Sequence, residues 1–410
     1  MLTTTAINPT ILSLPKPMTE DPLHLQVYQA GDSFMSMNDL LSYFVDPAFL
    51  KGGLSRISDM HCKVGRPVSF RIDDDLVPVT GGGGVEPQAM ETFLRAVLSD
   101  KHQAIVFGDD SADVDTGYEW RENNVNFRLN VFHDRDGLAF VMRMLSSDIP
   151  NIESLGLPSE AMWREIVQLN RGLVLVTGVT GSGKSTTIAA LINYINRFRK
   201  TRIITLEDPV EFIYKSEESM VSQRQVGQNV ATFSGGLRSA LRENPDIIFV
   251  GEIRDLETAS LALSAAETGH LVFSTLHTRD AKGALSRIVD MFPPEQTKNL
   301  CLQLSFSLSW VLSQKLVPRA DGQGRILAME VLKNISAIGN LIRTGNWQQV
   351  YSTMETQTKE GMMTMEQHLM HLYQHGFVSR ESVLTNANEA SVIDRLNQME
   401  RAQAAQVQKR

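Results

Sequence analysis

One stretch of the chain has the residue types and spacing of a phosphate-binding loop. It reads Gly-x-x-x-x-Gly-Lys-Ser followed by Thr, and it consists of Gly178, Val179, Thr180, Gly181, Ser182, Gly183, Lys184, Ser185 and Thr186. In such a loop the backbone N–H groups surround phosphate oxygens, the lysine reaches the β- and γ-phosphates, and the serine hydroxyl ligates Mg²⁺. We therefore expect these residues to bind ATP, with Ser185 as one ligand of the metal.

The segments on either side of this loop fit a strand and a helix. Residues 173–176 are a short apolar run, and after the loop apolar side chains recur at Ile188, Leu191, Ile192 and Ile195. That recurrence is the spacing of one helix face. A helix that begins at the loop adds a partial positive charge toward bound phosphate.

Three further apolar segments end in polar residues. They cover 202–206, 246–250 and 270–274, and they are separated by segments with a helical pattern. Alternating strands and helices favour a parallel sheet, in which the carboxyl ends of the strands share one edge and ligands bind there. The sequence therefore predicts that the residues after these strands meet around the phosphate.

The carboxylates after these strands suit phosphoryl transfer. Glu252 follows its strand at the position where a nucleotide hydrolase holds the carboxylate that orients attacking water. Gly251 stands where an aspartate for magnesium is usual, so we expect Glu207 and Asp208 to act there through the metal or its waters. Capping of a turn remains the alternative for Glu207 and Asp208.

Two histidines bracket the fourth strand, at His270 and His277. An imidazole close to a γ-phosphate can donate a hydrogen bond to it or share its charge. We expect both histidines at the active edge, although ordinary core or surface histidines would also explain them.

Composition limits the function classes. The chain has 410 residues, 42% of them hydrophobic, and a net charge of −8. An acidic chain has no general attraction for nucleic acid or anionic lipid. Its two cysteines, Cys62 and Cys301, suit a reducing cytoplasm. Neither a secretory signal nor a run of about 20 apolar residues is recognisable, so we expect a cytoplasmic protein without a transmembrane segment.

The pattern along the chain predicts an α/β protein with a smaller N-terminal α+β domain. The expected boundaries are 1–38 for a flexible extension, 39–148 for the N-terminal domain, 149–165 for a linker, 166–290 for the ATPase core, 291–395 for a C-terminal helical part and 396–410 for a polar tail.

Four segments together resemble the type II/type IV secretion ATPase superfamily, and within it the type IV pilus retraction ATPases. They are residues 171–187, 204–214, 241–258 and 265–278. The resemblance implies a RecA-like motor domain, a PAS-like N-terminal domain and a homo-hexameric ring. It further implies Mg-dependent ATP hydrolysis at the cytoplasmic face of the inner membrane. The partners it implies are a pilus platform protein in that membrane and paralogous ATPases.

The same resemblance implies roles for individual residues. Glu252 would activate water, Glu207 would support magnesium and water, and His270 and His277 would respond to the γ-phosphate. Arg128 and Arg143 match arginines that reach bound nucleotide as the domains close. On their own, two arginines of a small domain are ordinary surface residues.

Two segments depart from the pattern of the retraction ATPases. Gly339 replaces an arginine in the segment 337–343, and residues 58–62 are an altered form of an N-terminal motif. An extension or secretion ATPase, and a ring scaffold that binds ATP without hydrolysing it, therefore stay open. A nucleic-acid translocase is disfavoured by the acidic charge.

Overall fold

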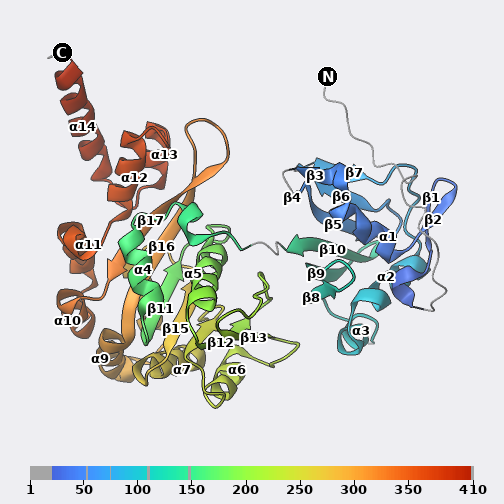
Figure 1. Cartoon of the computed structure of the whole chain (residues 1–410), viewed down its shortest axis with the longest axis horizontal. Coiled ribbons are helices and arrows are strands. Elements are labelled where there is room, and N and C mark those ends of the chain that lie inside the picture. The colour runs from blue at the N-terminus through green and yellow to red at the C-terminus, as the bar shows by residue number, and fades with distance from the viewer. Residues whose placement is uncertain (1–20, 52–53, 74, 109–110, 146–148, 408–410) are drawn as a thin grey trace. The chain divides into compact units, whose positions relative to one another are not determined.

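The chain divides into two compact units, Met1–Ser147 and Asp148–Arg410, in the computed structural model (Figure 1). The structure describes residues 21–51, 54–73, 75–108, 111–145 and 149–407, with side chains up to residue 401. Residues 1–20 of the expected extension and residues 408–410 of the expected tail lie outside this part of the chain.

The first unit is built on an antiparallel sheet. Its elements are β1 (Tyr28–Ala30), β2 (Ser33–Met35), α1 (Met37–Ser42), β3 (Leu50–Lys51), β4 (Leu54–Ser55), β5 (Ile57–Lys63), β6 (Ser69–Ile72), β7 (Asp75–Pro78), α2 (Pro87–Val97), α3 (Asp100–Val106), β8 (Val114–Trp120), β9 (Val125–Asp134) and β10 (Gly137–Leu145). Six strands form the main sheet in the order β7-β6-β5-β10-β9-β8.

Helices α1 and α2 cover one face of this sheet. The apolar face of α2, with Met90 and Phe93, packs with Leu40 of α1 and with Phe127 and Phe140 of the sheet. The alternation of side chains along a strand leaves polar residues such as Arg128 and Arg143 on the other face. The first unit thus has its own core and an open, polar sheet face.

Part of the expected N-terminal extension belongs to this core. Tyr28 and Met35 are buried, and the Tyr28 hydroxyl accepts a hydrogen bond from the Val68 backbone at 3.1 Å. Ser36 and Asp39 form a capping box that starts α1. Residues 21–38 are therefore ordered, in contrast to the flexible extension expected for residues 1–38.

The second unit alternates strands and helices. Its elements are α4 (Glu160–Gln168), β11 (Gly172–Thr177), α5 (Lys184–Phe198), β12 (Arg202–Glu207), β13 (Met220–Gln225), α6 (Phe233–Ala240), β14 (Ile247–Val250), α7 (Leu256–Glu267), β15 (Leu271–Leu276), α8 (Ala281–Asp290), α9 (Thr297–Ser307), β16 (Leu308–Pro318), β17 (Arg325–Lys333), α10 (Ser336–Thr344), α11 (Val350–Thr356), α12 (Met365–Gln374), α13 (Arg380–Asn386) and α14 (Val392–Val407).

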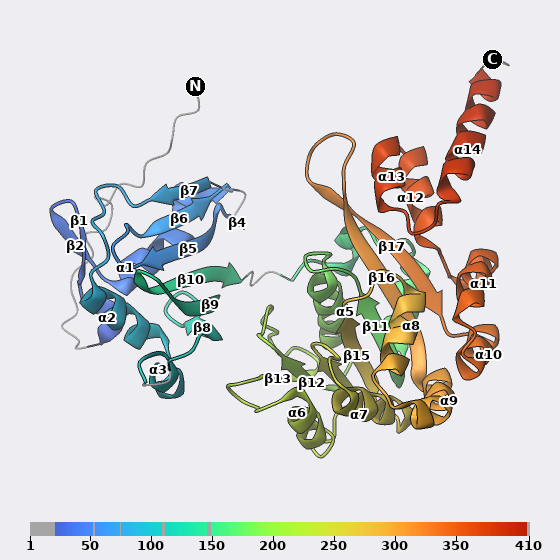
Figure 2. The same ribbon diagram turned by 180° about the vertical axis from the view of Figure 1, so that it is seen from behind.

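A seven-stranded sheet runs through this unit in the order β13-β12-β14-β15-β11-β16-β17. All neighbours from β13 to β16 are parallel, and only β16 and β17 pair antiparallel. Helices α4 and α5 pack on one face, while α6 to α9 pack on the other (Figure 2). The mixed α/β class and the four predicted strands are confirmed.

The region after residue 290 is less helical than expected. Strands β16 and β17 form a long hairpin that extends the sheet beyond β11 (Figure 2). The residues of β17 include Leu327, Ala328, Met329 and Glu330, which are strong helix formers, so local propensity favours a helix there. Burial against α12 overrides this preference, because Ala328 and Leu369 share one cluster.

The expected linker also contains structure. Helix α4 begins inside residues 149–165, with Ser159 as its N-cap. Trp163 and Ile166 are buried against Ile188 and Leu191 of α5. The second unit therefore starts earlier than residue 166.

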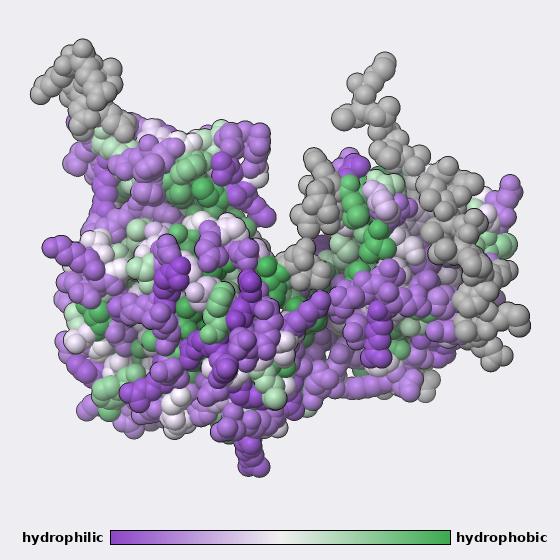
Figure 3. Space-filling view, viewed as in Figure 1, coloured by the Kyte–Doolittle hydropathy of each residue, from purple (hydrophilic) through white to green (hydrophobic). Residues whose placement is uncertain are grey.

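Within the described residues, every helix is too short or too polar to cross a bilayer. The surface of the second unit seen in Figure 3 is mainly hydrophilic, with scattered hydrophobic residues.

Candidate nucleotide-binding site

The phosphate-binding loop lies between the end of β11 and the start of α5, as the sequence predicts. Its glycines are required by the backbone. Gly183 has φ of +88° at the N-cap of α5. A Cβ atom on Gly178 would lie 2.4 Å from the Ser182 hydroxyl and 2.5 Å from the Gln314 carbonyl oxygen. Both positions therefore exclude larger residues.

Lys184 is folded across this loop. Its Nζ donates hydrogen bonds to the carbonyl oxygens of Gly178 at 2.9 Å and Val179 at 3.1 Å. Burial lowers the pKa of Lys184, while the charges of Glu252 and Glu211 raise it. A phosphate anion would be a stronger partner than two carbonyl oxygens, because the attraction between opposite charges adds to the hydrogen bond.

The residues of the loop fit a phosphate group. The Ser182 hydroxyl is buried and has no hydrogen-bond partner among the described residues. Ser185 and Thr186 follow at the first turn of α5 and are half-buried. A buried hydroxyl without a partner costs free energy, so a ligand that accepts a hydrogen bond from it would be stabilised there.

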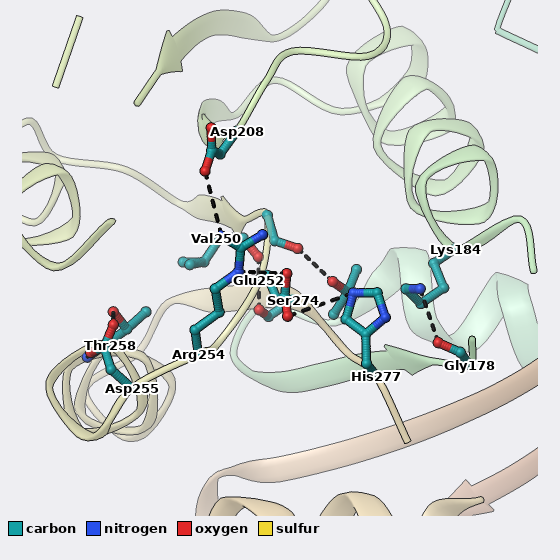
Figure 4. A network of polar contacts seen from close by, with 12 residues as sticks. Gly178, Lys184, Asp208, Val250, Glu252, Arg254, Asp255, Thr258, Ser274 and His277 are labelled. Carbon is teal, nitrogen blue, oxygen red and sulfur yellow. Dashed lines mark hydrogen bonds and ion pairs between the residues drawn. The ribbon is translucent and has the colours of Figure 1, made fainter. Parts of the chain in front are cut away.

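The carboxyl ends of four parallel strands meet at one edge, as expected. Thr177 of β11 pairs with Leu276 of β15, and Val250 of β14 pairs with Leu206 of β12 and with Ser274 of β15. Figure 4 shows Lys184, His277 and Glu252 in one neighbourhood after these strands.

Close approach of β12 explains the glycine before Glu252. The Gly251 N–H donates to the Leu206 carbonyl at 2.7 Å. A Cβ atom on Gly251 would lie 3.1 Å from that carbonyl oxygen and 3.4 Å from the Glu207 Cα. An aspartate at position 251 would therefore require β12 to shift by a few tenths of an ångström.

Glu252 lies within a group of charged side chains (Figure 4). Its Oε2 accepts from Arg254 Nε at 2.8 Å, and its Oε1 is 3.6 Å from His277 Nε2. Arg254 Nη1 is also 3.6 Å from Asp208 Oδ2. The ends of β14 and β15 are fixed by the Thr275 hydroxyl, which donates to the Gly251 carbonyl at 2.6 Å. Glu252 and His277 are thus brought together as predicted.

Glu207 is buried at the end of β12, where it is 5% exposed. Its Oε1 accepts from the Thr205 hydroxyl at 2.6 Å and from Gln223 Nε2 at 3.1 Å. Burial raises the pKa of Glu207 to about 7, against the opposing effect of these hydrogen bonds. A nearby cation would favour the ionised form, so Glu207 suits a position beside a metal or its waters.

His270 does not reach this edge. It precedes β15, and its backbone carbonyl accepts from Gly172 at the start of β11. Strand β15 has six residues. At about 3.3 Å per residue it separates its two ends by about 20 Å. The imidazole Nδ1 lies 3.0 Å from the Ala265 carbonyl oxygen. The placement of His270 at the active edge was wrong, because the two ends of one strand lie on opposite edges.

Arg128 and Arg143 belong to the first unit and lie directly opposite each other on β9 and β10. Arg143 donates to Asp59, a buried carboxylate, at 2.7 Å, and Arg128 pairs with Asp115. The side chain of Arg143 is 64% exposed and that of Arg128 is 45% exposed. Both guanidinium groups are thus solvent-accessible, and each is paired with a carboxylate of the same sheet.

Several neighbours of the site, among them Arg254, Glu211 and Gln223, were missed by sequence reasoning. Arg254 carries a usable signal, since it lies two residues after Glu252. Glu211 and Gln223 have no such signal in the sequence. Glu211 lies in an irregular segment, and Gln223 lies on β13. The residues of β13 are mostly polar and give no strand pattern.

An open pocket of about 520 Å³ adjoins the phosphate-binding loop. Its walls include the loop backbone at Gly178–Ser182, Arg279 after β15, Lys315 on β16 and Arg325 on β17. Lys315 is held by the Asn386 carbonyl and the Asn388 side chain, both at 2.7 Å. The pocket is thus polar and lined by cationic side chains.

Comparison with known proteins agrees with this geometry. The model of the family described as type II/IV secretion system protein matches residues 66–407. The type IV pilus retraction ATPase PilT of Pseudomonas aeruginosa is 40% identical over 331 residues, which cover 80% of this chain and 94% of that protein. A twitching motility protein of Neisseria gonorrhoeae is 43% identical over 298 residues, covering 73% of this chain and 78% of that protein.

A solved structure of the pilus retraction motor PilT with bound ADP superposes with a TM-score of 0.76. The two sequences are 42% identical, and the alignment covers 83% of this chain and 95% of the PilT chain.

Proposed function

We infer that this chain, which belongs to the type II/IV secretion system protein family, is an ATP-hydrolysing motor that powers type IV pilus retraction and twitching motility. The observation that carries this inference is the meeting of Lys184, Glu252 and His277 at one sheet edge. Two relatives that match over most of their length are a retraction ATPase and a twitching motility protein.

The phosphates of ATP bind at residues 178–186. Lys184 exchanges its two carbonyl partners for the β- and γ-phosphates, and the Ser182 hydroxyl gains an acceptor. Ser185 and Glu207 hold Mg²⁺, directly or through water. When bound, Mg²⁺ neutralises charge on the phosphate oxygens and so assists phosphoryl transfer.

Glu252 orients the attacking water. It follows β14, the strand next to β15, and its partner Arg254 is half-exposed, so the contact between them can be released at small cost. His277 is close enough to Glu252 to respond to the γ-phosphate beside it. His270 has no part in this edge and is not assigned a role here.

The base and ribose of the nucleotide occupy the pocket beside the loop. A triphosphate on the loop must place the rest of the molecule nearby, and a volume of about 520 Å³ falls in the range of small-molecule sites. Arg279 and Arg325 line that space and supply cationic donors.

The wider assembly follows from the family. The second unit is a RecA-like motor domain, supported by its strand order, and the first is a PAS-like domain, supported by its sheet with helices on one face. Six copies form a ring at the cytoplasmic side of the inner membrane and turn a pilus platform protein, in company with paralogous ATPases. Arg128 and Arg143 contact nucleotide within that ring.

Purified protein tests the enzymatic part. The wild type should release phosphate from Mg·ATP, Lys184→Ala should lose nucleotide binding, and Glu252→Gln should bind ATP with little turnover. Glu295→Gln, an exposed carboxylate after α8, is the matched control and should retain activity. Wild-type turnover in Glu252→Gln would refute the assignment of Glu252.

Deletion of the gene tests the biological part. Loss of a retraction motor should leave surface pili in excess and abolish twitching. Loss of the pili themselves would instead indicate an extension motor.

A further inference from the structure

Strand β16 contacts the end of β11 and the phosphate-binding loop that follows it. The Thr177 hydroxyl at the end of β11 donates to Ser313 Oγ at 2.7 Å. One residue further along β16, Gln314 Nε2 donates to the Ser182 carbonyl oxygen at 2.8 Å. Gln314 is 1% exposed, so this hydrogen bond is shielded from water.

The side chain of Gln314 is held tightly in this position. A Cβ atom on Gly183 would lie 3.2 Å from Gln314 Nε2, which places the amide directly against the loop backbone. Gln314 Oε1 is buried and has no hydrogen-bond partner among the described residues. The amide nitrogen must therefore face the loop, because the oxygen in its place would meet the Ser182 carbonyl oxygen.

The acceptor of this bond belongs to the peptide unit that joins Ser182 to Gly183. A trans peptide is planar, and its C=O and N–H point in opposite directions. When Gln314 holds the Ser182 carbonyl toward β16, it also turns the Gly183 N–H away from β16. Gly183 directly precedes Lys184, so this N–H is one of the donors that a phosphate on the loop requires.

We propose that Gln314 is a positioning residue for nucleotide binding, which acts by fixing the orientation of the Ser182–Gly183 peptide. This rests on the proposed ATPase function of the loop. Gln314 contacts the backbone of the loop and no reacting atom. It prevents rotation of a flexible, glycine-flanked peptide that would direct a carbonyl oxygen toward the phosphate.

Two substitutions separate this role from simple packing. Gln314→Met keeps a side chain of similar length and removes the donor. Gln314→Glu keeps the shape, and only its protonated form can donate to the Ser182 carbonyl. Gln303→Met is the matched control, since Gln303 Nε2 donates to Glu267 at an exposed position on α9. Steady-state ATPase kinetics and thermal unfolding are measured for each variant and for the wild type.

For Gln314→Met we expect KM for ATP to rise about tenfold, which corresponds to about 1.4 kcal/mol, with kcat within about twofold. Loss of an interaction made equally with bound substrate and transition state raises KM alone. In Gln314→Glu, burial of the new carboxyl group favours its protonated form, so the rise in KM relative to the wild type at the same pH should be larger at pH 8 than at pH 6. Gln303→Met should match the wild type.

The outcomes separate the two proposals. A wild type that does not hydrolyse ATP refutes the ATPase function. An active wild type with unchanged KM in both Gln314 variants refutes the role of Gln314. A fall in kcat with unchanged KM, or a ratio of the KM of Gln314→Glu to that of the wild type that does not change with pH, also refutes it, because either result points to packing alone. If Gln314→Met does not fold, the pH profile of Gln314→Glu decides.

Discussion

Substitution of Gly251 by alanine should damage both the stability and the activity of the second unit. Gly251 joins β14 to Glu252, and its φ angle lies outside the left-handed region, so alanine can adopt the backbone conformation. The added methyl group, however, would lie 3.1 Å from the Leu206 carbonyl oxygen and 3.4 Å from both the Glu207 Cα and the Phe233 ring.

The magnitude follows from these distances. An ordinary contact is a few tenths of an ångström longer than 3.1 Å, so β12 and β14 must move apart by that amount. Overpacking of a buried site costs about 1–3 kcal/mol. Alanine also lowers the conformational entropy of the unfolded chain, which offsets about 0.4–1 kcal/mol of this cost. We expect a net loss of about 1–2 kcal/mol in the free energy of unfolding. Because Glu207 and Glu252 flank the contact, kcat should fall by about tenfold.

Urea unfolding and phosphate release at saturating ATP measure these two effects. Gly339→Ala is the control, since a Cβ there would lie 3.4 Å from Asn334 Oδ1 and 3.6 Å from the Ser305 carbonyl oxygen. Alanine inside α10 should stabilise the protein by about 0.5–1 kcal/mol. If Gly251→Ala were as stable and as active as Gly339→Ala, close packing would not explain the glycine before Glu252.

Two further predictions concern pH. His368 is buried, its Nδ1 accepts from the Met329 N–H at 2.9 Å, and burial lowers its pKa to about 4 from 6.5. The stability it contributes is present above pH 6.5 and lost as the pH falls toward 4, by about 3 kcal/mol; His368→Asn should flatten this slope in urea titrations at a series of pH values. Glu330 is buried, and burial raises its pKa to about 7 from 4.5. Its contribution is present below pH 4.5 and lost as the pH rises through 7, also by about 3 kcal/mol; a Glu330→Gln variant with the wild-type slope between pH 5 and pH 8 would contradict this.

The nucleotide edge could be predicted from sequence because its signals are local. A glycine-rich loop between an apolar strand and a helix has few other interpretations, and parallel strands place their carboxyl ends together by topology. Lys184, Glu252 and His277 follow from that rule alone. The same rule, applied to both ends of one strand, gave the wrong position for His270.

The supports of the site could not be predicted in this way. Gln314 lies 132 positions after Ser182 in the chain, and their contact depends on the pairing of β16 with β11. The residues of β16 and β17 contain polar and helix-forming types, so no local pattern indicates a strand. The burial of Glu207 likewise depends on β13. The sequence of β13 is mostly polar and does not indicate a strand.

Glu252 must leave its ion pair with Arg254 before it can orient a water molecule, so the strength of this ion pair decides how much it slows catalysis. Arg254 is 57% exposed and Glu252 is 19% exposed, with Nε and Oε2 separated by 2.8 Å. An ion pair with one partner in solvent contributes about 0–1 kcal/mol. Release of Glu252 toward a water molecule would therefore lower the rate by no more than about fivefold, even if the whole contact were lost. Arg254 can thus hold Glu252 near Asp208 and His277 without preventing its action.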